Sequence, residues 1–222
     1  TPLYSSAASD VYKRQGTYSV LLQNGSSGVR FEGCRLGNVQ SPAASVDGPL
    51  AFVGNNLEGY DLDLQQTGGS SAGEVIVEDN DLRHLTITNS GPVVVRGNGI
   101  LDTAGYAMDF VINGSREIEV TGNRMQSLMV NNDTAVFIHG NSIYRSLSGG
   151  HRSTLTGVYS EGTRGIEVLS NQITQRNTHG GYPHARGVEL VDTKTGKVVN
   201  NEIDLYCQGV STYQGDNIGV YT

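Results

Sequence analysis

The sequence is poor in charge, in apolar residues and in uninterrupted apolar stretches. Charged residues make up 17% of the 222 residues and hydrophobic residues 36%, so the charge-rich composition of a disordered chain is absent. No apolar run of about 18 residues occurs, which excludes a transmembrane helix. Acidic residues outnumber basic ones 22 to 15, and this balance excludes the basic face of a general nucleic-acid binder. The 30 glycines show no three-residue period, so collagen is excluded. A turn-rich, all-β chain remains.

The first fifteen residues stand apart from the rest. Residues 5–15 read SSAASDVYKRQ, which resembles the in-frame translation of a transposase-type sequencing adapter; the alternative is a natural N-terminal segment. We therefore predict a non-native segment at residues 1–15 and a folded domain at residues 16–222, and a signal peptide cannot be sought at this terminus.

One repeat runs through the predicted domain. The pattern apolar-x-apolar-x-x-Asn-x-apolar occurs eight times, at residues 29–36, 50–57, 75–82, 93–100, 118–125, 136–143, 166–173 and 196–203. Its sixth position is Cys34 in the first copy and asparagine in the other seven: Asn55, Asn80, Asn98, Asn123, Asn141, Asn171 and Asn201. From position 34 to position 201 the seven intervals average about 24 residues. Self-similarity at such a period is the signature of a stacked repeat architecture.

The alternation of apolar residues within each repeat predicts short β-strands with one buried face. A second apolar strand position precedes most copies by eight residues, so each unit holds three short strands, an Asn turn and a variable loop. Such a unit cannot bury its apolar face alone, and stacking its neighbours at about 4.8 Å solves this. Asparagine suits the turn because it tolerates left-handed backbone and its amide can bond to the asparagine above.

These features resemble the right-handed parallel β-helix of the pectate-lyase-like family, over residues 16–222. The resemblance implies an all-β, right-handed parallel β-helix solenoid of about eight coils with an Asn ladder. A leucine-rich repeat, which also uses an asparagine position, is the alternative fold. Neither end shows the polar cap that solenoids need, so we expect a fragment truncated at both ends. Cys34 and Cys207 lie about seven coils apart, roughly 34 Å at the coil spacing, and are predicted not to pair.

Function is expected where the longest loops meet. The loops at residues 144–157 and 174–187 belong to neighbouring coils and contain no acid. Their cations and aromatic side chain predict a substrate-binding set, because arginine pairs with carboxylate and sulfate through two hydrogen bonds and tyrosine stacks on sugars. The predicted substrate-binding residues are Arg145, Arg152, Arg176, Arg186, Tyr182 and His184. Solvated loops with random charge are the alternative.

The outward face of the first strands is predicted to form the floor beside these loops. Glu161 and Glu189 lie one coil apart with an offset of two residues, so their Cα atoms are about 8 Å apart, a separation compatible with inverting glycoside hydrolysis. A lyase would need a cation, a base and a proton donor. The predicted catalytic residues are Glu161, Glu189, Tyr159, His151 and His179.

The resemblance implies a carbohydrate-active or carbohydrate-binding module for an acidic polysaccharide, lyase- or glycosidase-like, outside the cell or on its surface. Its family includes enzymes with clustered aspartate ligands for Ca²⁺, but this sequence shows no such cluster, so no metal ligand is predicted and the cofactor is left open. A polysaccharide is the expected partner, nucleic acid is not, and the oligomeric state is open. The alternative is a non-catalytic solenoid of a surface adhesin, a phage spike or a large exported protein.

Overall fold

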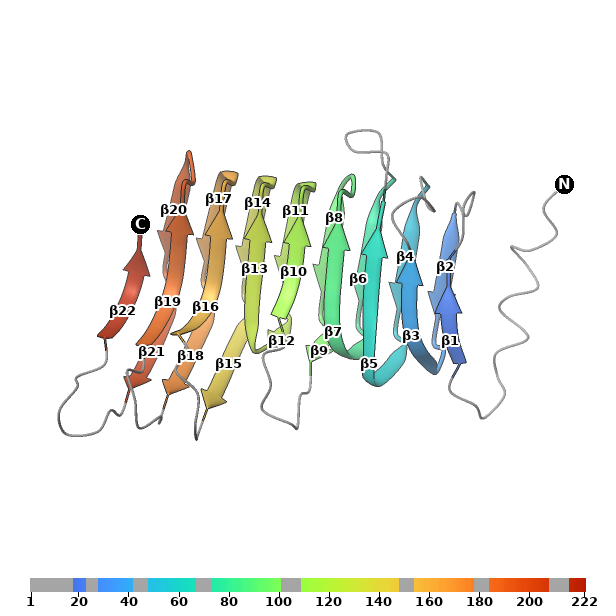
Figure 1. Cartoon of the computed structure of the whole chain (residues 1–222), viewed down its shortest axis with the longest axis horizontal. Coiled ribbons are helices and arrows are strands. Elements are labelled where there is room, and N and C mark those ends of the chain that lie inside the picture. The colour runs from blue at the N-terminus through green and yellow to red at the C-terminus, as the bar shows by residue number, and fades with distance from the viewer. Residues whose placement is uncertain are drawn as a thin grey trace, which may run out of the picture.

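The computed structural model describes residues 18–22, 28–41, 48–66, 73–100, 109–147, 154–177, 184–207 and 216–222. The predicted adapter segment at residues 1–15 lies outside these ranges. Within them every regular element is a β-strand, and every strand pair is parallel. The described part of the chain is therefore an all-β parallel solenoid, as the repeat predicted, with coils following one another along the long axis (Figure 1).

One sheet contains the first four residues of each repeat copy. Its eight strands stack in chain order. They are β2 (Val29–Glu32), β4 (Leu50–Val53), β6 (Val75–Glu78), β8 (Val93–Arg96), β11 (Arg116–Thr121), β14 (Thr134–His139), β17 (Arg164–Leu169) and β20 (Gly196–Val199). We call its outward side the flat face.

The second sheet has fourteen strands and covers two more sides of the solenoid. On one side lie β9 (Gly99–Ile100), β12 (Arg124–Met125), β15 (Ser142–Leu147), β18 (Gln172–Asn177) and β21 (Glu202–Cys207). On the other lie β10 (Asp109–Asn113), β13 (Ser127–Asn131), β16 (Thr154–Glu161), β19 (His184–Val191) and β22 (Asp216–Tyr221). Four strands near the N-terminus are β1 (Tyr18–Leu21), β3 (Leu36–Ser41), β5 (Asn56–Gln65) and β7 (Asp81–Thr88). Since β7 pairs with both β9 and β10, it joins the two sides.

The core follows the predicted alternation. In β6 and β8 the first and third residues are buried and the second is half-buried, because successive side chains of a strand point to opposite sides. The same inward positions align from coil to coil, as where the rings of Phe31 and Phe52 stack 5.3 Å apart. Each coil therefore covers the apolar side chains of the next.

The predicted Asn ladder is present and buried. In each rung the backbone N–H and the side-chain amide donate to the side-chain oxygen of the next asparagine: Asn98 bonds in this way to Asn123 at 2.9 Å from both donors. The Nδ2 of Asn98 also donates to the carbonyl of Val77 in the coil before (2.8 Å). Cys34 occupies the first rung and donates its backbone N–H to Asn55, and both Cys34 and Cys207 are free thiols.

The left-handed backbone of this turn lies one position earlier than the sequence analysis placed it. The residue before the ladder position has positive φ in every copy: Gly33, Gly54, Asp79, Gly97, Gly122, Gly140, Ser170 and Asn200. Glycine is frequent there because it lacks the Cβ that makes this conformation costly. The asparagine itself is chosen for its hydrogen bonds.

A second polar ladder, which the sequence analysis missed, runs along the turn before the eight-stranded sheet. Its buried members are Ser90, Ser115, Asp133 and Thr163, with Thr193 half-buried at the end. Each follows a residue of positive φ: Asn89, Gly114, Asn132, Gly162 and Asp192. The N–H of Ser90 donates to Ser115 Oγ (3.1 Å), and that of Ser115 donates to Asp133 Oδ1 (2.7 Å). Both turns thus use the same device of a left-handed residue followed by a buried polar side chain.

The predicted loops at residues 144–157 and 174–187 are shorter than expected. Strands β15 and β18 continue to Leu147 and Asn177, and β16 and β19 begin at Thr154 and His184. The strand pattern was hidden because polar residues occupy aligned positions there: Arg145 pairs with Gln175 across β15 and β18, and Gln175 is fully buried.

Candidate functional site

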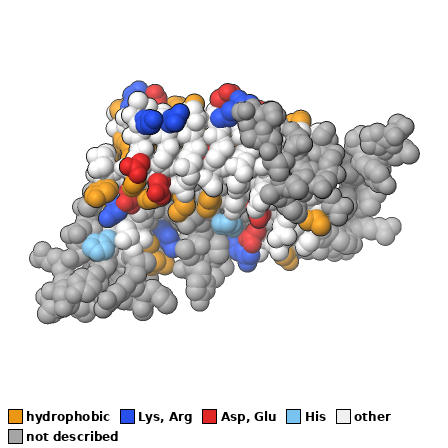
Figure 2. Space-filling model, turned by 45° about the horizontal axis from the view of Figure 1, so that its top comes forward, with side chains coloured by type: hydrophobic (Ala, Val, Ile, Leu, Met, Phe, Trp, Pro, Cys, Tyr) orange, Lys and Arg blue, Asp and Glu red, His pale blue; other side chains and the backbone are white. Residues whose placement is uncertain are grey.

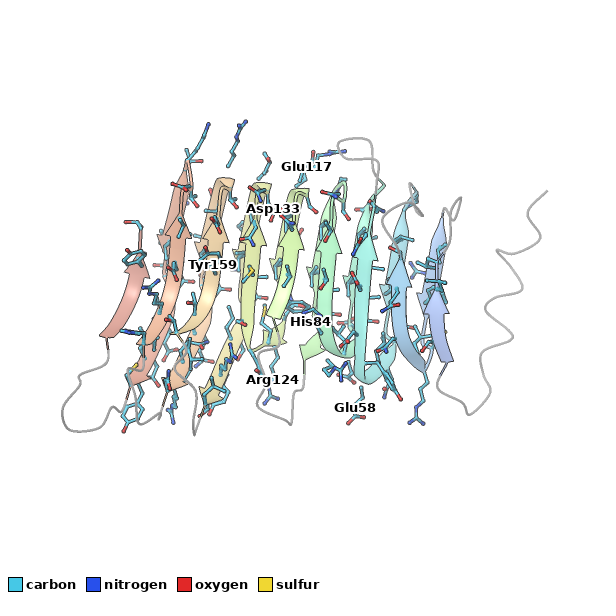
Figure 3. The ribbon with its side chains drawn as sticks, viewed as in Figure 1. Glu58, His84, Glu117, Arg124, Asp133 and Tyr159 are labelled. Atoms are coloured by element: carbon cyan, nitrogen blue, oxygen red, sulfur yellow. The ribbon has the colours of Figure 1, made fainter. Side chains whose placement is uncertain are left out.

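The predicted floor residues lie on two adjacent strands. Tyr159 and Glu161 are on β16, and Glu189 is on β19. Tyr159 stands opposite Glu189 in the register and Glu161 opposite Val191, which is the two-residue offset that the sequence analysis expected. Tyr159 lies at mid-height of the solenoid, well away from the turn that holds Asp133 (Figure 3).

Tyr159 and Glu161 form one hydrogen-bonded pair. The hydroxyl of Tyr159 donates to Glu161 Oε2 at 2.8 Å. This bond raises the pKa of Tyr159 above its ordinary value, because the carboxylate stabilises the protonated phenol, and burial adds in the same direction. Tyr159 is therefore a hydrogen-bond donor at neutral pH, committed to Glu161 in this arrangement.

Glu189 is buried and bound on both sides. Only 7% of the surface of Glu189 is exposed to solvent. It accepts a hydrogen bond from Thr156 Oγ1 (3.3 Å) and forms an ion pair with Arg186. The Arg186 guanidinium also lies over the ring of Tyr221, 4.6 Å from its centroid. Thr156 and Tyr221 were not singled out from the sequence, and the aligned strands β16, β19 and β22 bring them to Glu189 and Arg186.

The remaining predicted binding residues are divided between two places. Arg145 lines a hollow of about 160 Å³ at the start of the strand extensions. The other residues of its lining are Ser127, Leu128, Met129, Thr154, Thr156 and Tyr159. Arg176 instead lies on β18 and pairs with Asp204 of β21 at 3.3 Å, with both side chains exposed. His184 begins β19, opposite Thr154.

Four predicted site residues, His151, Arg152, His179 and Tyr182, lie outside the described residues. Among the described ones, Tyr159, Thr156 and Arg145 all line the hollow. Thr156 also donates a hydrogen bond to Glu189, which forms an ion pair with Arg186. Figure 2 shows one face of the molecule, with charged side chains along its upper edge, at its left and near its lower centre, and with backbone and other side chains between them.

Within the described ranges, no three His, Cys, Asp or Glu side chains lie close enough together to hold a metal ion. The same part of the chain contains no helix with the length and apolar character needed to cross a membrane.

The fold and these contacts define a class: an all-β parallel solenoid with three stacked strand surfaces and two buried polar ladders. No model of a known protein family matches the chain, and no curated protein matches it. Among solved structures, a trypsin-treated variant of QnrB1, a plasmid-mediated fluoroquinolone resistance protein, aligns with a TM-score of 0.39 and 12% identity over 85% of this chain and 92% of QnrB1. HetL, a pentapeptide repeat protein involved in heterocyst differentiation regulation from the cyanobacterium Nostoc sp. strain PCC 7120, aligns with a TM-score of 0.30 and 8% identity over 86% and 90% of the two chains.

These findings correct the family assignment. The solved structures found include a pentapeptide repeat protein, and the prediction of a pectate-lyase-like, carbohydrate-active module is wrong. The physical reason lies in the motif itself: a buried asparagine after a left-handed residue satisfies the turn of any parallel coil, so the ladder predicts stacking and does not specify a family. The polysaccharide partner and the Ca²⁺ that the resemblance implied lose their basis with it. At these TM-scores the solved structures supply no function for this chain.

Proposed function

We propose that the chain is a non-catalytic solenoid module, a stiff spacer that carries its surfaces as part of a surface adhesin, a phage spike or a large exported protein. The observation that supports this best is the Asn ladder, whose hydrogen bonds link every coil from Asn55 to Asn201 and are buried in all but the last rung. Coils joined in this way resist bending, since each bend would break bonds between groups that have no water nearby. We propose an extracellular or cell-surface location on the same grounds.

The contacts among the predicted site residues favour this function over chemistry. Arg186 and Glu189 neutralise each other, as do Arg176 and Asp204. A general acid or base must reach its substrate within hydrogen-bond distance, and Glu189 is covered by Thr156 and Arg186. The contacts of Thr156 with Glu189 and of Arg176 with Asp204 each join neighbouring coils and help to hold them in register.

Small-angle scattering together with a turnover assay tests the proposal. We expect the scattering of a rod whose cross-section is unchanged from 10 to 50 °C, and no product from uronate, sulfated or neutral polysaccharides. Turnover that is abolished by Glu161→Gln or Glu189→Gln but kept by Glu167→Gln, on the opposite sheet, would overturn the proposal. Scattering from a flexible chain would overturn it as well.

We also infer that the coils wind right-handed, because connections between parallel strands of a sheet take that hand in about 98% of cases. An experimental electron-density map tests the hand directly, and a left-handed coil would contradict this inference.

A further inference from the structure

The flat face carries an ordered pattern of side chains. Its outward positions are the second and fourth residues of each four-residue segment of the eight-stranded sheet, and the register places them in two columns. One column reads Arg30, Ala51, Ile76, Val94, Glu119, Phe137, Glu167, Lys197, and the other reads Glu32, Val53, Glu78, Arg96, Thr121, His139, Leu169, Val199.

The charged side chains of these two columns pair with one another. Arg96 bonds to Glu119 at 3.0 Å and lies 3.7 Å from Glu78. Arg30 pairs with Glu32 at 2.9 Å, and Lys197 with Glu167 at 3.8 Å. The flat face can therefore be covered by another surface without burying a charge that has no counter-charge, which is the costly event in docking.

Two apolar patches lie on either side of the central charges. The first patch consists of Ala51, Val53, Ile76 and Val94, all half-buried. The second consists of Phe137, Leu169 and Val199, and Phe137 and Val199 are 37% and 39% exposed. Beside Phe137 a shallow hollow of about 430 Å³ opens where Ala135 and Gly165 leave little side chain.

We propose that the flat face is an interface between two copies of this chain, related by a two-fold axis that runs along the strands between β8 and β11. This axis brings β6 opposite β14 of the other copy, β4 opposite β17, and β8 opposite β11. Ile76 then meets Phe137 and the hollow beside it, and Val53 meets Leu169. Arg96 comes next to Glu119 of the second copy.

The order of the side chains argues for a second copy as the occupant. Ile76 and Val53 of the first patch meet Phe137 and Leu169 of the second, and Arg96 and Glu119 flank the centre of the strand order β2-β4-β6-β8-β11-β14-β17-β20. A two-fold interface requires this kind of self-complementarity. Eight strands at about 4.8 Å and four residues at about 3.3 Å give roughly 500 Å² per copy, or about 1,000 Å² in total, the lower limit for a specific interface. The dimer is therefore weak and depends on concentration. This inference goes beyond the proposed function and does not require it.

Sedimentation velocity of the full chain over a hundredfold range of concentration tests the interface. We expect the wild type to pass from monomer to dimer, and Ile76→Glu and Phe137→Glu each to weaken the dimer at least tenfold. Thr86→Glu, at an outward position of β7 on another side, should dimerise as the wild type does. Circular dichroism melts establish that each variant is folded.

A charge exchange distinguishes this arrangement from other dimers. Arg96→Glu and Glu119→Arg should each weaken self-association, and an equimolar mixture of the two variants should form a heterodimer, because opposite charges then meet across the axis although each chain has lost its internal Arg96–Glu119 pair. A wild type that stays monomeric at every concentration would overturn the proposal. Dimers that survive both glutamate substitutions, or growth beyond the dimer through the ends of the solenoid, would also overturn it.

Discussion

Each internal ladder asparagine uses its whole side chain. Asn123 donates from Nδ2 to Asn141 and to the carbonyl of Val95, while its Oδ1 accepts two bonds from Asn98. No other residue type offers an acceptor and a two-proton donor at this length. Replacing one asparagine therefore leaves hydrogen-bond donors and acceptors in the coils on both sides without a partner. All of these groups lie in a buried turn.

The substitution Asn141→Leu tests this at a central rung. We expect the free energy of unfolding to fall by about 2–5 kcal/mol, because the donors of Asn123 and the carbonyl of Val120 lose their partner in a buried place. Asn113→Leu, at a half-buried outward position where the side-chain oxygen accepts a long hydrogen bond of 3.4 Å from Asn132, is the control and should change stability by less than about 0.5 kcal/mol. Urea denaturation measures both, and equal losses would contradict the ladder account.

Asp133 places an ionisable group in the second ladder. It is 1% exposed, its Oδ2 has no hydrogen-bond partner among the described residues, and burial raises its pKa to about 7 against the bonds from the backbone of Ser115 and Asn131. The carboxyl is thus protonated in the folded chain at pH values where it is ionised in the unfolded chain. The contribution of Asp133 to the free energy of unfolding is therefore most favourable below about pH 4, and it falls as the pH rises toward 7.

Asp133→Asn should remove this pH dependence. A pKa difference of about three units corresponds to roughly 4 kcal/mol, so we expect the variant to gain up to that amount over the wild type at pH 8 and little at pH 4. Thermal melts between pH 4 and pH 8 measure the difference. A gain that is the same at all pH values would show that Asp133 is not the group that titrates.

At the scale of elements, the strand extensions depend on two glycines. A Cβ at Gly157 would lie 2.4 Å from Cγ2 of Ile173 and 2.8 Å from the carbonyl oxygen of Gly187, and one at Gly187 would lie 2.6 Å from Cγ2 of Ile203. Strands β16 and β19 therefore approach β18 and β21 more closely than any side chain allows. The two sides of the solenoid are held together here by backbone packed on isoleucine.

Gly157→Ala and Gly187→Ala should each destabilise the chain by about 1–3 kcal/mol through overpacking. Gly219→Ala is the matched control on β22, because nothing lies within 4 Å of its added methyl. Differential scanning calorimetry of the three variants makes the comparison. A loss at Gly219 as large as at Gly157 would mean that the close approach is not the cause.

The sequence allowed some elements to be predicted and hid others. The eight strands of one sheet and all rungs of the Asn ladder were predicted because apolar alternation and a constant residue coincide there. The second ladder was not predicted because its rungs are Ser, Ser, Asp, Thr and Thr, which can all form hydrogen bonds but are not one constant residue type. At the site, Glu161 and Glu189 were placed correctly by counting, but the bonds of Glu189 to Arg186 and Thr156 depend on side-chain directions that spacing does not contain.

At the scale of the whole molecule, each coil contacts chiefly the coils before and after it, so stability is expected to vary along the axis. The backbone amides of Asn98 and Asn123, in the middle, should exchange with solvent most slowly. Those of Asn171 and Cys34, nearer the two ends of the described coils, should exchange at least tenfold faster. Native-state hydrogen exchange followed by NMR measures this, and uniform protection at all rungs would indicate that the solenoid opens only as one unit.

The ladder joins coils of very different length by identical bonds. Asn80 and Asn98 are 18 residues apart and Asn141 and Asn171 are 30 apart, yet their Nδ2–Oδ1 distances are 3.0 and 2.9 Å. Evolution can therefore lengthen, shorten or duplicate whole coils at the junctions between β15 and β16 or β18 and β19 without altering a single rung. A one-residue insertion between the left-handed residue and its asparagine would instead displace that asparagine from its rung and leave the neighbouring rungs without a partner. The gene of such a protein should tolerate large changes in length and be intolerant of small ones at the turns.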